Sequence, residues 1–191
     1  MKDARRFEVA RQAFHILFGG FLMAGSLALG PKHTLLGYFV ALLVGLFILH
    51  LKMRGHELPL IDSVLKRFER KDAAFPGQGA LMYFAGALFV LSFTPFSFAL
   101  AAIAIVAFGD GFATLVGLYG KWPLPWNPRK RAEGLLAFIF SAAAISSLVL
   151  PIGHAIAYSV VLGILETVDL PADDNLLLPL AATILYYAVP L

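Results

Sequence analysis

Long apolar runs alternate with short polar segments along the whole chain. A helix needs about 20 mostly apolar residues to cross a bilayer, and several of these runs approach that length. We therefore predict seven membrane spans, with limits near 12–29, 34–51, 79–93, 96–118, 129–150, 153–168 and 176–191. The third and sixth runs are near the lower limit of spanning length, so each of these helices could be tilted, broken or partly re-entrant.

The longest polar segment, residues 52–78, contains a helical pattern of its own. Apolar residues recur there at helical spacing with cations between them: Ile61, Val64, Leu65 and Phe68. This pattern predicts a short amphipathic helix over 62–70 that lies on the cytoplasmic surface of the membrane. The helix either gates lipid access or is a solvated connector.

Composition is typical of a polytopic integral membrane protein. The 191 residues are 60% hydrophobic and 14% charged, and no hydrophilic block is large enough to fold separately. We therefore expect one all-α domain over residues 1–191. The chain has no cysteine, which excludes disulfides and thiolate metal sites. Its net charge of +3 comes without aromatic or glycine-rich basic runs, so no nucleic-acid partner is expected, and the oligomeric state stays open, a homodimer included.

The distribution of lysine and arginine predicts the orientation. The amino terminus and the segments 52–78 and 119–131 hold fourteen of the fifteen cations, and Lys32 is the exception. Because positive charge gathers on the cytoplasmic side, we expect the amino terminus and these two segments to face the cytoplasm. Seven spans also place the loop 166–175 on that side.

Asp110 lies within an apolar run, about 12 Å along the helix from the next polar loop. A carboxylate at such depth costs at least about 2.5 kcal/mol, so it normally has a partner, a cavity or a cation. Gly109 and Gly111 leave room on both sides of it. A metal-bound phosphate fits this position; a hydrogen bond to a neighbouring helix is the simpler alternative.

Three cations follow Asn127-Pro128, which is a typical helix start. Arg129, Lys130 and Arg131 would then lie in the first helical turn, where the helix dipole disfavours cations. An anion is therefore expected beside them, and Lys121 adds a further positive charge to this candidate phosphate site. The alternative is that these residues only follow the cytoplasmic bias of positive charge.

The loop 166–175 is acidic on a side where cations are expected. It contains four carboxylates and no cation: Glu166, Asp169, Asp173 and Asp174. We interpret Asp173 as the cap of the last helix and Asp174 as a ligand of metal or substrate, because magnesium takes one or two carboxylates plus substrate phosphates.

One predicted membrane face thus combines acids for a metal with bases for phosphate: Arg11, His15, Asp110, Lys121, Arg129, Lys130, Glu133, Glu166, Asp174 and Asn175. Phosphoryl transfer requires this combination of groups. The sequence has no GxxxxGK[ST] phosphate loop, HExxH, GxSxG or GxGxxG motif. His15 is either a catalytic group or a hydrogen-bonded interfacial histidine.

Four spaced motifs are ARQAFH at 10–15, FGDGFATLVGLYGK at 108–121, RKRAEG at 129–134 and DDNLLLP at 173–179. Together they resemble the CTP-dependent polyprenol kinases, a family that includes dolichol kinase, phytol kinase and a CTP-dependent diacylglycerol kinase and is related to the phosphatidate cytidylyltransferases. The matched positions are Arg11, His15, Asp110, Gly117, Gly120, Lys121, Lys130, Glu133, Gly134, Asp174, Asn175 and Pro179. Gln12 stands where the family usually has lysine, and Arg131 where it has a hydroxyl residue.

The resemblance implies a membrane lipid kinase that transfers the terminal phosphate of CTP to a long isoprenoid alcohol, or to diacylglycerol, at the cytoplasmic face. The metal candidates, for Mg²⁺, are Asp110, Glu133, Glu166 and Asp174. The candidates for binding the CTP phosphates are Arg11, Lys121, Arg129, Lys130, Arg131 and Asn175. Catalytic candidates are Asp110, Asp174 and His15, and the general base is not assigned. Cytidylyl transfer to a lipid phosphate and a small transporter remain as alternatives.

Overall fold

The computed structural model describes residues 2–70 and 73–189, and apart from one isolated bridge between Pro123 and Arg131 its regular structure is helical. The helices are α1 (Lys2–Met53), α2 (Pro59–Phe68), α3 (Gln78–Phe93), α4 (Phe96–Ala104), the π-helix η1 (Ile105–Asp110), α5 (Gly111–Gly117), α6 (Ala132–Ser146), α7 (Ile152–Glu166) and α8 (Asp174–Ala188). The all-α class is thus confirmed for the described residues.

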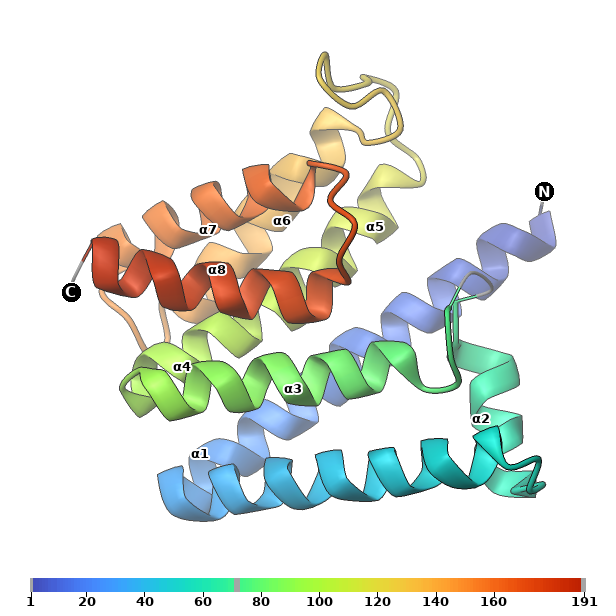
Figure 1. Ribbon diagram of the computed structural model, residues 1–191. Helices are drawn as coiled ribbons and strands as arrows, with labels where there is room; N and C mark the ends of the chain where they lie inside the picture. Colours follow the sequence, from blue (N-terminus) through green and yellow to red (C-terminus); the bar gives the residue numbers. More distant parts are fainter. Residues whose placement is uncertain (1, 71–72, 190–191) are drawn as a thin grey trace.

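Helix α1 is a pair of arms joined by a sharp bend (Figure 1). Gly30 has a φ of 75°, which residues with a side chain rarely adopt, and Pro31 then opens the second arm. The Thr34 hydroxyl donates across the bend to the carbonyl of Ser26 at 3.3 Å. The apolar runs predicted at 12–29 and 34–51 are therefore the two arms.

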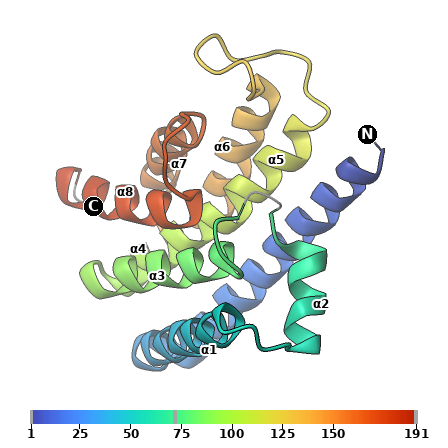
Figure 2. The same cartoon turned by 45° about the vertical axis from the view of Figure 1, so that its right-hand side comes forward.

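The core is built around one continuous helical stretch, α4–η1–α5, which runs through the middle of the bundle (Figures 1 and 2). Helices α1, α3, α6, α7 and α8 all pack against it. The largest fully buried apolar side chains belong to this stretch and to the helices around it: Phe98, Leu100, Ile103, Ile105, Phe138, Leu162 and Leu178.

Glycines let the first arm of α1 lie very close to the central stretch. A Cβ added to Gly19 would come within 2.3 Å of the Cβ of Ala107. A Cβ on Gly111 would come equally close, 2.3 Å, to Cγ1 of Ile16. Real side chains do not approach so closely, so glycine at these two positions sets the spacing between α1 and the helix that carries Asp110.

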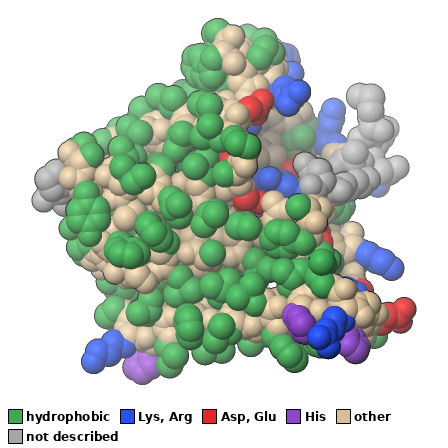
Figure 3. All heavy atoms as spheres, viewed as in Figure 1, with side chains coloured by type: hydrophobic (Ala, Val, Ile, Leu, Met, Phe, Trp, Pro, Cys, Tyr) green, Lys and Arg blue, Asp and Glu red, His purple; other side chains and the backbone are tan. Residues whose placement is uncertain are grey.

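Two helical stretches in the described part of the chain are long and apolar enough to cross a membrane, Arg5–Met53 and Phe96–Gly117. Hydrophobic side chains cover most of the face seen in Figure 3. Many are exposed on the second arm of α1, where Leu36 is 59% and Phe47 is 60% exposed. Helices α3, α6 and α7 are apolar but only 15 or 16 residues long, shorter than a typical span.

The prediction that a helix starts at Asn127-Pro128 is wrong, because α6 begins at Ala132. The side-chain oxygen of Asn127 accepts the Arg129 N–H at 3.1 Å, and its carbonyl accepts the Lys130 N–H at 3.0 Å. The Ala132 N–H then donates back to the carbonyl of Trp122 at 2.8 Å. The segment 119–131 is therefore a loop folded on itself, and its cations lie outside the first helical turn.

Substitution of Gly19 tests the close packing of α1. Gly19→Ala is expected to cost about 1–3 kcal/mol of stability, because the new methyl group overlaps Ala107. Gly25→Ala on the same helix is the matched control, since a Cβ there meets no atom within 4 Å. Thermal unfolding in detergent would measure both variants, and an equal melting temperature for the two would contradict this account of the interface.

Candidate functional site

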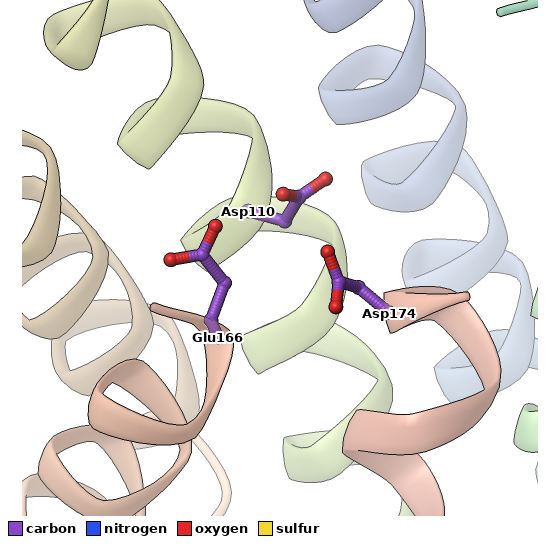
Figure 4. A group of neighbouring side chains, drawn as sticks. All are labelled: Asp110, Glu166 and Asp174. Carbon is purple, nitrogen blue, oxygen red and sulfur yellow. The ribbon is translucent and has the colours of Figure 1, made fainter. Parts of the chain in front are cut away.

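Three carboxylates from three separate segments meet at one place in the structure. Asp110 ends the π-helix η1, Glu166 ends α7 and Asp174 begins α8, and Figure 4 shows their side chains turned toward one another. One oxygen from each lies within 4.8 Å of the other two. Asp110 is only 5% and Glu166 only 3% exposed.

The local fold around Asp110 explains how a carboxylate fits at this depth. The six-residue π-helix widens the helical turn just before it, a feature that is frequent at functional sites. Its neighbour Gly109 receives the ring of Phe138 from α6, and an added Cβ there would lie 2.8 Å from that ring. Helix α6 can therefore pack directly against the turn that carries Asp110.

Asp174 is held by the start of α8. The side chain of Asp173 accepts the backbone N–H of Asn175 at 3.0 Å, so the prediction that Asp173 caps this helix is confirmed. Gln78 of α3 donates to the same carboxylate at 3.3 Å. Gly86 lets α3 and α8 meet backbone to backbone, because a Cβ there would lie 2.5 Å from the carbonyl oxygen of Asn175.

Glu166 is placed by a contact between the end of α7 and the loop 119–131. Asn127 donates to the carbonyl of Thr167 at 2.8 Å, and the indole N–H of Trp126 donates to the Thr167 hydroxyl at 2.9 Å. Thr167 is 1% exposed. This attachment brings Lys130 of the loop to Glu166, where the two side chains form an ion pair.

Lys130 supplies positive charge to the carboxylate group. Burial by itself lowers the pKa of Lys130, but the charge and hydrogen bond of Glu166 outweigh it and the pKa is raised. Lys130 is therefore an ammonium ion. Three carboxylates this close together disfavour joint ionisation, so a further cation beside them would stabilise their ionised forms.

The donor set fits magnesium. Its ligands are hard oxygens, it is usually held by a few carboxylates together with substrate phosphates, and its bonds of about 2.0–2.1 Å place opposite ligands about 4.2 Å apart. Adjacent ligands of such an ion lie only about 2.9 Å apart, so oxygens within 4.8 Å of one another would bind it after the side chains move inward, or through water molecules that magnesium usually keeps. Asp110, Glu166 and Asp174 are thus the residues that would hold the ion.

A basic cavity of about 250 Å³ adjoins the carboxylates. Its lining includes Arg129, Lys130, Arg131 and Glu166. Arg131 is oriented by a 2.6 Å hydrogen bond from its guanidinium to the carbonyl of Pro128, whereas Arg129 has only a loose, exposed pairing with Asp169 at 3.7 Å. The cavity has the charge and the position to take phosphate groups beside the metal ligands.

Not every predicted site residue lies at this centre. Glu133 is outside the carboxylate group: it accepts the backbone N–H of Lys121 at 2.6 Å and that of Trp122 at 3.3 Å. The side chain of Lys121 is exposed and outside the lining of the basic cavity. Arg11 pairs with Glu8 at 2.5 Å within α1.

His15 and Asn175 are not members of the carboxylate group either; they line a second cavity next to it, which they share with Arg11. The structure thus brings together three of the four metal candidates. It divides the phosphate candidates between the two cavities, except Lys121, which lines neither.

Several features of the site were not expected from the sequence: the π-helix before Asp110, the ion pair between Lys130 and Glu166, and the attachment of Asn127 to Thr167. Asn127 carried a signal, but the Asn-Pro pair was interpreted as a helix cap. The ion pair joins residues 36 positions apart, and no local pattern indicates it.

No family model matches the chain, and no solved structure matches it. An uncharacterized protein of Methanocaldococcus jannaschii is 28% identical over 177 residues, which cover 90% of this chain and 88% of that protein. The comparisons therefore identify a similar archaeal protein but no activity.

The carboxylate group predicts that Mg²⁺ stabilises the protein. Mg²⁺ should raise the melting temperature in detergent. At a concentration one hundred times its dissociation constant, it should raise the free energy of unfolding by about 2.7 kcal/mol. Asp110→Asn should lose this shift, whereas Glu57→Gln, which changes an exposed carboxylate, should retain it. The shift should also weaken as the pH falls, because protons compete for the ligands. An unchanged shift in Asp110→Asn would contradict the assignment.

The hydrogen bonds between Glu133 and the loop 119–131 lead us to expect that this loop changes conformation at acid pH. Backbone N–H groups lower the pKa of this carboxyl group, first that of Lys121, then that of Glu133 itself and then that of Trp122. The carboxyl group lies at the polar end of α6. Its stabilising effect is therefore complete above the ordinary glutamate pKa of about 4.3, and it is lost as the pH falls through the lower folded value.

Both tryptophans of the chain, Trp122 and Trp126, lie in this loop, so their fluorescence reports the transition directly. Glu133→Gln should remove the transition. A transition that persists in this variant would assign it to another group.

Proposed function

We propose that the protein is an integral membrane lipid kinase that transfers the terminal phosphate of CTP to the hydroxyl of a long-chain isoprenoid alcohol. The observation that carries the proposal is the group Asp110, Glu166 and Asp174 beside a basic cavity, because phosphoryl transfer needs a metal site and phosphate-binding cations in contact. The preference for CTP and for an isoprenoid alcohol rests on the resemblance of the four motifs.

The residues divide into two roles. Lys130 and Arg131, with Arg129 at the rim, hold the phosphates of the nucleotide in the basic cavity. The three carboxylates hold the metal ion, which when bound would neutralise charge on the phosphate oxygens. Glu133 acts indirectly, since it fixes the loop that carries these cations.

The transfer step is an in-line displacement. The alcohol oxygen attacks the γ-phosphorus and forms a new O–P bond, while the bond between that phosphorus and the β–γ bridging oxygen breaks. CDP leaves with the electron pair, and the alcohol proton passes to a carboxylate, with Asp110 and Asp174 as the candidates.

The arrangement of the helices supports a cytoplasmic site in the bilayer. The amino terminus, α2 and the loops 119–131 and 167–173 lie toward one end of the molecule, and the bend of α1 and the carboxyl-terminal end of α8 lie toward the other (Figure 1). We propose that the two arms of α1, the stretch α4–α5, and helices α3, α6, α7 and α8 are the seven segments that cross or enter the membrane, with the cation-rich end in the cytoplasm.

A transfer assay with labelled nucleotide tests the proposal. Purified protein, Mg²⁺ and a mixture of lipid acceptors are incubated with CTP labelled in either the γ- or the α-phosphate. We expect γ-label in the lipid phase, and we expect Asp110→Asn to lower its rate by at least a hundredfold, while Glu57→Gln retains the wild-type rate.

Other outcomes would overturn the proposal. Label from the α-phosphate in the lipid phase would mean cytidylyl transfer instead. No transfer from CTP or ATP would favour a transporter. Full activity of Asp110→Asn would remove the role of the carboxylate group.

A further inference from the structure

A second cavity of about 320 Å³ lies between the first arm of α1, helix α2 and the start of α3. Its walls are mainly apolar and aromatic, with contributions from Phe14, Phe18, Leu65, Phe68, Tyr83 and Phe84. The volume lies at the lower end of the range for small-molecule sites, about 300–1,000 Å³. The walls are suited to a hydrocarbon chain.

Three residues that line this cavity have an unsatisfied buried polar atom: His15, Tyr83 and Asn175. Nε2 of His15 and Oδ1 of Asn175 are both buried, and neither has a hydrogen-bond partner among the described residues. Buried polar atoms without partners are rare in native proteins, so a missing ligand or water is indicated. A hydroxyl group can satisfy such atoms, because it is both a donor and an acceptor.

The polar part of the cavity is adjacent to the carboxylate group. Asn175 directly follows Asp174 on the first turn of α8. Ile16, the neighbour of His15, packs against Gly111, which directly follows Asp110. A hydroxyl bound at His15 and Asn175 would therefore lie beside the residues that hold the metal, on the side away from the basic cavity.

Helix α2 covers the cavity without being part of the core. None of its ten residues is buried, and it lies across α1 at the outer edge of the molecule (Figure 2). It is attached to the first arm of α1 by stacking of Phe68 on Phe14, with ring centroids 4.4 Å apart, and to the second arm by an ion pair of Asp62 with Lys52 at 2.5 Å. Such a surface helix can separate from the bundle at little cost.

We infer that this cavity binds the acceptor of the proposed kinase as a single hydrocarbon chain, with its hydroxyl at His15 and Asn175 and with α2 as the cover. The inference rests on the proposed function. A volume of about 320 Å³ is at the lower end of the range for small-molecule sites, which suits the first part of one chain better than two chains side by side. The acceptor is therefore a single-chain alcohol, not a diacylglycerol.

A pair of tryptophan substitutions on α2 tests the cavity. Leu65→Trp places an indole into the cavity, whereas Leu60→Trp, the matched control, adds it at a position that is 78% exposed and outside the lining. The probes are radiolabelled geranylgeraniol, a twenty-carbon single-chain alcohol, and 1,2-dioctanoylglycerol. Binding to purified protein is measured by scintillation proximity, independently of phosphate transfer.

The expected result is at least a tenfold loss of geranylgeraniol affinity in Leu65→Trp, a matching rise in its KM, and no change in Leu60→Trp. The KM for CTP should not change in either variant, which shows that the phosphate site is intact. Equal geranylgeraniol affinity in the two variants would overturn the inference, as would absence of binding to the wild-type protein. Dioctanoylglycerol binding that Leu65→Trp also weakens would overturn the single-chain assignment.

The assay separates this inference from the kinase itself. Geranylgeraniol binding that depends on Leu65, without any transfer of phosphate, would overturn the kinase and leave the cavity assignment in place. Equal rates of phosphate transfer in Leu65→Trp and Leu60→Trp would support the kinase and overturn the cavity assignment.

Discussion

Repulsion among three clustered carboxylates, two of them buried, is the constraint on which the rest of this structure depends. Asp110, Glu166 and Asp174 come from three different segments, and one oxygen of each lies within 4.8 Å of the other two. Asp110 and Glu166 are buried. Like charges this close strongly disfavour joint ionisation unless positive charge is present. Lys130 supplies one such charge at Glu166, and a divalent cation held by the three carboxylates would supply more.

The packing of the helices opposes this repulsion. Glycines at the contacts of α1, α3 and α6 allow backbones and large side chains to approach the turns that carry the carboxylates, and the π-helix adjusts the direction of Asp110. The loop 119–131 is tied to the end of α7 through Asn127 and Trp126, so Lys130 is delivered to Glu166 by a fixed contact. The site is thus assembled by contacts between segments, and no single motif contains it.

The carboxylates lie between two cavities of different chemistry. The basic cavity beside α5, α6 and α7 suits an anionic group, and the apolar cavity beside α1, α2 and α3 suits a hydrocarbon chain. An enzyme that joins a water-soluble phosphate donor to a membrane lipid needs this separation, with the reacting groups meeting at the metal. Exposed apolar side chains on α1 are consistent with a lipid surrounding on that side.

The sequence by itself determined the helical class, the approximate limits of most helices, the division between the apolar runs 12–29 and 34–51, the amphipathic helix before α3 and the cap at Asp173, because these depend on local periodicity and backbone preference. It also singled out Asp110, Glu166 and Asp174, since a carboxylate in an apolar run and an unexpected acidic loop are visible without a fold.

Only the tertiary structure decided that these three meet and that Glu133 fixes a loop instead. It also decided that Lys130 pairs with Glu166 and that Arg11 and His15 belong to a different cavity from the loop cations. Such pairings join residues far apart in the chain, and they depend on how helices pack, which local pattern does not specify.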